Sequence, residues 1–527
     1  MSPGWPVVLP PLLAIGLALA WRRVLPSLLL GVWAGATLLA GGRPLTALLR
    51  VGDTYLVNAL ADRDHAAIVL FSLLLGGMVG ILSRAGATEG MVRALTGRVR
   101  GRRAAQTATA GLGTVIFFDD YANTLLVGNA MRPLCDRLGV SRAKLAYLVD
   151  STAAPVTSVA VISTWIGFEV GLIQDAMQRL SLDGSGYLFF LRSLPYSFYP
   201  LLTLLFVYLV AGSGRDFGPM AAAERRAARG DGAVKDAAAA AGETPAPAAS
   251  PWLAVVPLLV VILATVGGLW YSGRTALTAA GAAHPTLREI LQSADSLAVL
   301  MWASLSGVLT AGALVTGARR LSLAETSEAW LAGAREMLVA MAILVLAWSL
   351  GKVCDELGTA RWLVEQSRGL LSVHLLPAVS FLLAAAVSFA TGTSWGTMAI
   401  LIPMIFPMAH ALPAAAGVSA AAASGILLAS VRAVLAGAVF GDHCSPLSDT
   451  TIMSSMASGC DHVEHVRTQL PYAVTVAAAA VLCGYLPAGY GAPPAVSLLL
   501  GGLLLAAWLR WRGRNPAAGA AATGGTP

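Results

Sequence analysis

Two short polar segments interrupt long apolar runs, and each pairs aspartate with proline. The first is "DSTAAPVTS", from Asp150, and the second is "GDHCSPLSDTT", residues 441–451. Proline lacks a backbone N–H and disrupts the surrounding helix, which frees carbonyl oxygens. Such oxygens, together with carboxylates and hydroxyls, suit a hard cation such as Na⁺. A proline kink in the first segment, patched by hydroxyl groups, is the simpler alternative.

Segment 104–131 contains the adjacent carboxylates Asp119 and Asp120, with Asn123 close behind. Carboxylates inside a membrane are costly and usually functional. As a helix, the residues that precede Asp119 would reach roughly 21 Å, so we expect the pair in the membrane interior. The alternative is a helix-capping aspartate in a loop.

A third polar segment, "FATGTSWGTMAILIPMIFPM", spans residues 389–408. Its glycines Gly392 and Gly396 permit a sharp hairpin tip, where Thr393 and Ser394 offer oxygen ligands. A glycine-rich turn can also bind phosphate, but no Walker lysine follows it, which argues against nucleotide binding.

The two proline segments align without gaps, "APVTSVAVIS" (154–163) with "SPLSDTTIMS" (445–454), and an aspartate precedes each. Asp449 has no acidic counterpart, because Ser158 occupies the equivalent position. We therefore predict that Asp150 and Asp449 share an ion or proton, supported by the other polar side chains. The full set of candidates is Asp119, Asp120, Asn123, Asp150, Thr393, Ser394, Asp442, His443, Ser445, Ser448, Asp449 and Thr450.

Zinc-type ligands also gather around the second segment. They are Asp442, His443, Cys444, Cys460, His462 and His465. Neither CxxC nor HExxH is present, so we expect no metal beyond a transported ion, and no cofactor. His443 is better explained as a hydrogen-bonding or proton-handling neighbour of the aspartates.

The composition is that of a polytopic membrane protein. Of 527 residues, 57% are hydrophobic and 12% are charged, against about a quarter charged in a soluble domain. The net charge of +7 comes from basic residues in short loops, which indicates topology signals rather than nucleic-acid binding. No nucleophile–base pair indicates an enzyme.

About eleven spans and two hairpins are expected, since a span needs about 20 apolar residues. The predicted spans are 6–21, 24–41, 66–82, 194–212, 252–271, 296–316, 332–350, 470–488 and 495–511, with broken helices at 143–167 and 419–458 and hairpins at 104–131 and 371–411. Residues 213–250 are predicted to be a solvated cytoplasmic linker, and the tail from Asn515 to be disordered.

The basic loops 83–103 and 132–144 both indicate a cytoplasmic location, so the segment between them must enter and leave on one side. The same rule places the linker and the C-terminus in the cytoplasm and the N-terminus outside. The predicted domains are inverted repeats 1–212 and 251–490, separated by the linker and followed by an extra helix and tail, 491–527. This is the plan of many secondary transporters.

The sequence resembles the NhaC-type Na⁺/H⁺ antiporter family of the ion transporter superfamily. The resemblance lies in "FFDDYANTLLVGNAMRPLCDRLGVSRAKLAYLVDSTAAPVTSVAVISTW", "TGTSWGTMAILIPM" and "FGDHCSPLSDTTIMSSMASGCDHVEHVRTQLPY". It implies inverted repeats, paired re-entrant hairpins and a transport domain that moves on a scaffold, often in a dimer. It brings the candidate side chains into the family's characteristic segments without assigning their roles.

Two functions follow from these patterns. The first is exchange of Na⁺ for protons across a bacterial cytoplasmic membrane, because carboxylates in a poorly hydrated site hold protons more tightly and can bind either ion. The alternative is Na⁺- or H⁺-coupled transport of a small organic acid, such as malate or lactate, or of an amino acid. No arginine lies at the polar binding segments themselves, because Arg432 precedes Asp442 by about two and a half helical turns, and this favours the bare cation.

Overall fold

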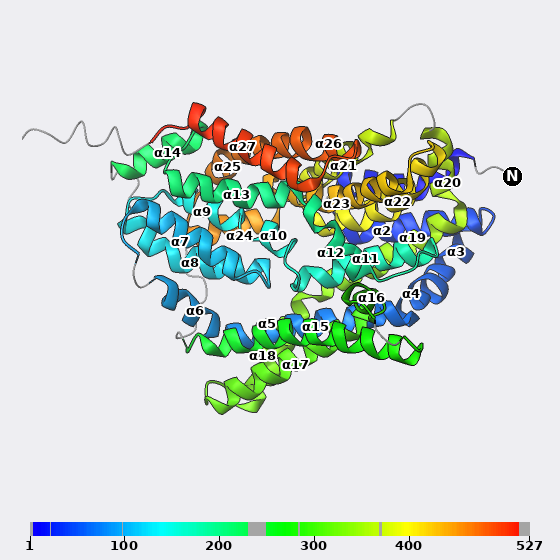
Figure 1. The fold of residues 1–527 in the computed structure, drawn as a ribbon, viewed down its shortest axis with the longest axis horizontal. Coiled ribbons are helices and arrows are strands. Elements are labelled where there is room, and N and C mark those ends of the chain that lie inside the picture. The colour runs from blue at the N-terminus through cyan, green and yellow to red at the C-terminus, as the bar shows by residue number, and fades with distance from the viewer. Residues whose placement is uncertain are drawn as a thin grey trace, which may run out of the picture.

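The computed structural model describes residues 4–21, 23–96, 99–229, 249–282, 285–367 and 372–515. Half of the predicted linker, residues 230–248, and nearly all of the predicted disordered tail lie outside the described residues. Nearly everything described is helical (Figure 1), which confirms the all-α class.

The first half of the chain forms the helices up to α14. They are α1 (Leu9–Trp21), α2 (Val24–Leu39), α3 (Pro44–Arg50), α4 (Val57–Ala61), α5 (Arg63–Arg84), α6 (Ala87–Thr96), α7 (Arg102–Val115), α8 (Asp120–Arg137), α9 (Arg142–Asp150), α10 (Ala154–Thr157), α11 (Thr164–Arg179), α12 (Gly186–Ser193), α13 (Phe198–Ser213) and α14 (Gly218–Ala228). Tighter or wider helical turns occur at Trp5–Val8, Val51–Leu56 and Leu194–Tyr196.

The second half forms the remaining helices. They are α15 (Trp252–Ala279), α16 (Leu287–Gln292), α17 (Ser296–Gly317), α18 (Leu323–Glu336), α19 (Leu338–Leu357), α20 (Thr359–Ser367), α21 (Leu376–Thr391), α22 (Ser394–Ala415), α23 (Ala420–Cys444), α24 (Asp449–Ser458), α25 (His462–Ala479), α26 (Leu486–Gly489) and α27 (Pro494–Arg512). Short turns occur at Val373–Leu375 and Ala480–Tyr485.

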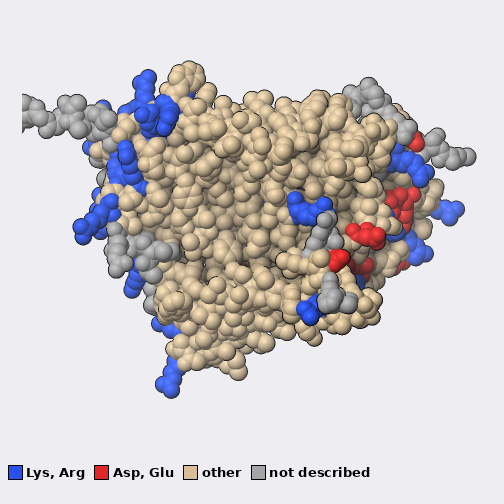
Figure 2. Space-filling model, in the orientation of Figure 1, with Lys and Arg blue, Asp and Glu red and all other residues tan. Residues whose placement is uncertain are grey.

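The length and composition of the helices agree with a multi-pass membrane protein. Among the described residues, nine helices are long and apolar enough to cross a membrane, and up to eleven if each of two bent pairs counts as one span. The bent pairs are 24–61, with a 120° bend, and 186–213, with a 51° bend. In Figure 2, Lys and Arg occupy one end of the visible face and both signs of charge the other, with a broad uncharged band between them.

One predicted span, 332–350, has different bounds in the structure. Residues Leu323–Glu336 form the separate helix α18, and the span α19 begins only at Leu338. Ser322 opens α18 with a capping box, in which its hydroxyl binds the Glu325 N–H while the Glu325 carboxylate accepts the Ser322 N–H. The apolar period continues through the junction, so hydropathy alone does not separate the two helices.

Helices α5, α15, α17 and α18 pack together along one side of the molecule (Figure 1). On the other side α23 packs between α21 and α22 and is largely buried. Helix α11 is buried over nearly its whole length and contacts α5, α19 and α22. It therefore joins the two sides.

Both predicted broken helices are discontinuous in the structure. Helix α9 stops at Asp150 and the chain restarts as α10 with Pro155 in its first turn. Helix α23 stops at Cys444, and α24 begins at Asp449 after Ser448 caps it. The second parts differ despite the sequence alignment, because α10 is a single turn whereas α24 continues for ten residues.

Each break is preceded by a helical hairpin, so the order of elements is the same in the two halves. Hairpin 1 consists of α7 and α8, and Asp119 caps α8 at its tip. Hairpin 2 consists of α21 and α22, and turns at Gly392, whose φ of 71° favours glycine. Both arms of hairpin 2 could cross a membrane by length, so the re-entrant geometry and the inverted symmetry stay predictions.

Candidate ion-binding site

The two helix breaks bring a pair of aspartates together inside the protein. Asp150 and Asp442 each lie in the last turn of a half-helix, α9 and α23, and are 1% and 4% exposed. The Asp442 carboxylate interacts electrostatically with Asp150 and also with Asp120 of hairpin 1. Segments far apart in the sequence therefore place their acidic groups in one buried region.

Side chains from the second half of the chain bind Asp150 directly. Its Oδ2 accepts hydrogen bonds from Thr451 Oγ1 at 3.1 Å and from Gln469 Nε2 at 2.5 Å. The same Gln469 Nε2 donates to the backbone carbonyl of His443 at 2.6 Å. Gln469, on α25, thus connects the first break to the second.

His443 makes a second connection between the breaks. Its Nε2 lies 3.0 Å from Ser151 Oγ, and its Nδ1 lies 2.7 Å from the Tyr199 hydroxyl of α13. Both ring nitrogens therefore have partners, which fixes the orientation of the ring. This contact places His443 beside the aspartates, where the sequence predicted it.

Hairpin 1 is bound to the first break at its tip. Asp119 accepts from the Ala122 N–H at 2.7 Å and from Thr164 Oγ1 at 3.0 Å. Asn123 Nδ2 contacts three carbonyl oxygens, those of Gly113, Ile116 and Thr152, at 2.6 to 3.0 Å. Asp119 is thus both a helix cap and a buried group, so the capping alternative and the buried location are not exclusive.

Other polar groups of α8 face the same region and offer oxygen atoms. Asp120 is 2% exposed and is followed one turn later by Thr124. Asn123 Oδ1 and Thr124 Oγ1 are buried and have no hydrogen-bond partner among the described residues. Unpaired buried oxygens are costly unless something binds them.

Hairpin 2 meets the second break. Ser445 Oγ donates to the Phe389 carbonyl at 2.8 Å, and a Cβ on Gly392 would lie 2.7 Å from the Leu447 carbonyl oxygen. Thr393 caps α22 by accepting from the Gly396 N–H, and Ser394 is buried in the first turn. These tip residues lie where the hairpin meets the break, and among the described residues neither the Thr393 nor the Ser394 hydroxyl binds an aspartate.

The second break treats its two aspartates differently. Asp442 Oδ2 accepts from Thr450 Oγ1 at 3.2 Å, and Ser448 Oγ lies 2.9 Å from Thr450 Oγ1. Asp449, by contrast, is exposed in the first turn of α24. Thr451 thus binds Asp150, and Asp150 and Asp442 are both buried, whereas Asp449 is exposed.

Several acids, Asp449 among them, surround the Tyr121 side chain of α8. The phenol interacts electrostatically with Asp120, Asp449, Asp442 and Asp119. Among these four acids Asp449 is the exposed one, whereas Asp119, Asp120 and Asp442 are buried. This location suits an entrance to the site better than its centre.

Outside the proline segments, sequence reasoning missed Gln469, Tyr199 and Tyr121. Each lies on an ordinary helix outside the proline segments. An uncharged amide in a membrane helix is a signal that could have found Gln469. The tyrosines carry no such signal, because aromatic residues are common in apolar helices.

Arg432 is the buried cation closest in sequence to the second break. Its guanidinium donates to Glu169 Oε2 at 3.1 Å, to Ser197 Oγ at 2.5 Å and to the Ser158 carbonyl at 2.5 Å. Each of its nitrogens therefore has a partner within the protein. This arrangement leaves the group engaged rather than free to bind a substrate carboxylate.

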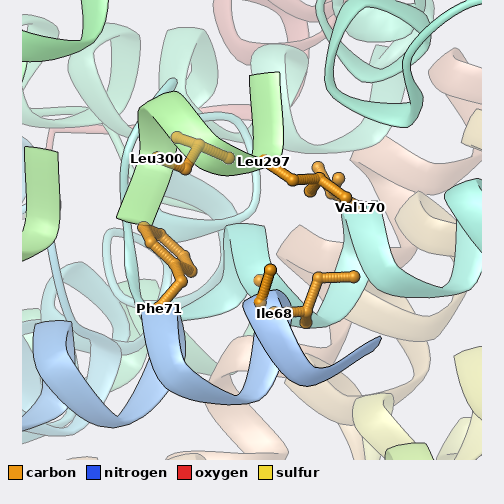
Figure 3. Close-up of a pocket in the computed structure, with 7 residues that line it drawn as sticks. Ile68, Phe71, Val170, Leu297 and Leu300 are labelled. Atoms are coloured by element: carbon orange, nitrogen blue, oxygen red, sulfur yellow. The ribbon is translucent and has the colours of Figure 1, made fainter. Parts of the chain in front are cut away.

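A small apolar crevice between α5, α11 and α17 does not belong to this site. It is lined by Ile68, Phe71, Val170, Leu297 and Leu300, together with Ala67 and Gly167 (Figure 3). The crevice has no room for a water molecule. Its lining offers no side-chain oxygen, so it cannot hold an ion.

Comparison with known proteins gives this arrangement a context. The Na⁺/H⁺ antiporter family matches residues 157–489, which is more than half of the chain. The chain belongs to the Na⁺/H⁺ antiporter family. The match includes hairpin 2, the second break and Gln469, whereas Asn123 and Asp150 precede it.

Individual relatives extend the likeness over the whole chain. A Haemophilus influenzae protein of uncharacterized function is 35% identical over 491 residues, which is 92% of this chain and 91% of that protein. An uncharacterized Na⁺/H⁺ antiporter of the same organism is 34% identical over 152 residues, covering 28% of this chain and 29% of its own length. The malate-2H⁺/Na⁺-lactate antiporter of Bacillus subtilis is 30% identical over 138 residues, 25% of each chain.

The fold of this chain is shared with a solved structure. The crystal structure of the YdaH transporter of Alcanivorax borkumensis superposes with a TM-score of 0.56 at 16% identity, covering 88% of this chain and 89% of that one. At this identity the likeness concerns the fold alone. It shows that the two chains share an overall fold.

Proposed function

We propose that this transporter exchanges Na⁺ for protons across the cytoplasmic membrane by alternating access. The observation that carries the proposal is the buried meeting of Asp150 and Asp442 at two helix breaks, with unpaired oxygens of Asn123 and Thr124 nearby. A hard cation binds such oxygens, and a proton competes for the carboxylates. Exchange follows if the site reorients only when it holds one or the other.

The pair of aspartates proposed to bind the ion differs from the pair predicted from the sequence. Asp150 and Asp442 would share the ion or proton, with Asp120 and the α8 oxygens alongside them. Asp449 and Tyr121 would lie at the entrance, because Asp449 is exposed. Ser445, Thr393 and Ser394 would hold hairpin 2 against the break, and no resident metal or cofactor takes part.

The second candidate is coupled exchange of a small organic acid or amino acid. It is favoured by the likeness to the malate-2H⁺/Na⁺-lactate antiporter and to the arginine/ornithine antiporter ArcD of Halobacterium salinarum. In this case the N-termini of α8 and α22 would face the substrate carboxylate. The engagement of Arg432 with Glu169 argues for the bare cation.

Proteoliposomes containing the purified protein distinguish the two functions. A pH-sensitive dye inside the vesicles reports proton movement when Na⁺ is added outside, first alone and then with malate, lactate or an amino acid. We expect proton movement with Na⁺ alone. Movement only in the presence of an organic partner would replace the first function with the second.

A further inference from the structure

Helix α14 and the residues that lead into it contain two carboxylates, Asp216 before the helix and Glu224 within it, whose burial is unexpected. The sequence predicted a solvated linker from residue 213, yet Asp216 and Glu224 are each 1% exposed. Lys144, counted in the sequence among cytoplasmic loop charges, is completely buried. In Figure 1, α14 lies at one end of the molecule beside α9, α25 and the end of α27.

Asp216 connects the base of α9 to the second half of the chain. Its carboxylate forms an ion pair with Lys144 and accepts from the Tyr472 hydroxyl at 2.8 Å. The adjacent Phe217 ring stacks on Tyr472 at 4.4 Å between centroids. The Asp216 backbone pairs with Arg514, after α27. Asp216 thus joins α9, α25 and the end of α27.

Glu224 connects hairpin 1 to the same half-helix. Its Oε1 accepts at 2.7 Å from the backbone N–H of Ser141, the residue whose side chain caps α9. Its Oε2 accepts from Arg102 at 2.7 Å and from Gln106 at 3.3 Å, both on α7. Burial raises the pKa of Glu224, while Lys144 and Arg102 oppose that rise by favouring the charged form. Hairpin 1 and α9 are therefore joined through one carboxylate.

This joint lies at the far end of a rigid element from the proposed site. Helix α9 runs from Arg142 to Asp150, a length of roughly 12 Å. A displacement of its first turn therefore moves the Asp150 carboxylate as well. Hairpin 1 carries Asp120 and Asn123 on its other arm, so the relative position of α7 and α9 sets the distance between the two groups of oxygens.

We propose that α14 and the residues leading into it fix the position of hairpin 1 relative to α9, and that Asp216 and Glu224 are positioning residues for the ion site. We call this joint, formed by Asp216, Glu224 and their partners on α7 and α9, the clamp. The proposal rests on the proposed ion site, though not on which ion it carries. A buried ion pair is weak support for stability by itself, since desolvation offsets much of the attraction. A role in geometry accounts for three buried charges that stability alone does not require.

The first test compares two variants of the same helix. Glu224→Gln keeps the shape of the side chain and removes the charge, whereas Arg226→Gln removes an exposed ion pair with Glu464 and serves as the matched control. Concentrations of half-saturation and maximal rates are measured in proteoliposomes. The substrate is Na⁺, or whichever organic substrate the wild type moves if Na⁺ alone drives nothing.

We expect Glu224→Gln to raise the half-saturation concentration about fivefold or more, the size of a typical coupling between linked sites. The maximal rate should change much less, and Arg226→Gln should match the wild type. If the charge loss prevents folding, the double variant Lys144→Met, Asp216→Asn removes both charges without leaving one unpaired. The same shift is expected there.

Cys135 reports the state of the clamp independently of transport. This thiol is 1% exposed on α8 and interacts electrostatically with Glu224. Mass spectrometry after brief treatment with a water-soluble maleimide compares its labelling with that of the part-exposed Cys460. We expect Glu224→Gln to increase labelling of Cys135 and leave that of Cys460 unchanged.

Two outcomes would overturn the clamp. One is increased labelling of Cys135 with an unchanged half-saturation concentration, which would make the joint structural only. The other is an equal shift in Arg226→Gln. A wild type that moves protons only with an organic substrate contradicts the proposed function instead, and the clamp is then judged on that substrate.

Discussion

At the scale of single residues, burial separates side chains that the sequence places on an equal footing. Asp150, Asp442 and Asp449 all lie beside helix-breaking prolines, yet only the first two are enclosed. The hydrogen bonds of Thr451 and Gln469 to Asp150 explain why this carboxylate is held in one place. The proposed centre of the site therefore moves from Asp449 to Asp442.

Substitution of the aspartates tests this ranking. Asp150→Asn and Asp442→Asn should each lower Na⁺-dependent proton movement roughly tenfold or more, because a hydrogen bond to a charged group contributes about 1.5–3 kcal/mol. Asp449→Asn should stay within about fivefold of the wild type, as exposed charges contribute at most about 1 kcal/mol. Everted vesicles with matched protein levels provide the measurement. The ranking requires near-normal proton movement in Asp449→Asn. If Asp449→Asn abolishes proton movement while Asp442→Asn leaves it unchanged, the assignment made from the sequence is the correct one.

The buried pair of Arg432 and Glu169 has a different expected effect, on stability. Glu169→Gln leaves the Arg432 cation without its counter-charge and should lower the free energy of unfolding by about 3–5 kcal/mol. Removing both charges, in Arg432→Met with Glu169→Leu, should cost less than the single change. Thermal unfolding in detergent measures both.

The exposed pair of Lys352 and Glu356 is the control for that comparison. Lys352→Gln should alter the free energy of unfolding by no more than about 1 kcal/mol, because water screens the Lys352–Glu356 pair.

The buried pair gives the contradicting outcome. If the double variant of Arg432 and Glu169 is less stable than Glu169→Gln, the Arg432–Glu169 pair contributes net stability.

At the scale of elements, close helix contacts and helix ends determine the geometry. Helices α5 and α18 approach so closely that a Cβ on Gly333 would lie 2.2 Å from the Gly76 carbonyl oxygen. The breaks and hairpin tips are stabilised by caps from Asp119, Ser141 and Ser448. Small residues and caps are thus placed where helices must touch or stop.

Gly333→Ala should separate α5 from α18 and destabilise the protein by about 1–3 kcal/mol through overpacking. Gly312→Ala on α17 is the matched control, because the nearest atom to its Cβ would be 3.8 Å away. Unfolding temperatures in detergent compare the two. Equal stability of the two variants would contradict the close approach.

At the scale of the whole molecule, charged side chains lie at the two ends of the visible face (Figure 2), with an uncharged band between them. Lys and Arg gather at the end where α14 lies, whereas the other end of the same face carries both signs of charge (Figure 2). The positive-inside rule assigns the basic end to the cytoplasm. Hence α14 and the end of α27 are predicted to be cytoplasmic and the N-terminus external.

Reporter fusions after Arg514 test that orientation. Green fluorescent protein fused there should fluoresce, and alkaline phosphatase at the same site should be inactive, because each enzyme or fluorophore matures on one side only. A fusion at the N-terminus should give the reverse pattern. Active phosphatase after Arg514 would invert the topology.

The membrane class and the two helix breaks can be predicted from the amino-acid sequence alone. These follow from local properties, such as hydropathy over about 20 residues and the missing N–H of proline. Asp150, Asp442 and His443 stand out in the sequence because ionisable side chains are rare in such runs. The boundary between α18 and α19 was missed, since an apolar period crosses it.

Only the tertiary structure decided which polar groups meet. Gln469 reaches Asp150 across more than 300 positions of sequence, and Glu224 joins α7 to α9 from a segment that looks solvated. Burial of a polar group depends on neighbours contributed by distant helices, because each must supply a partner for every desolvated atom. No local pattern contains that information, and for this reason the sequence favours Asp449 whereas the packing of the helices favours Asp442.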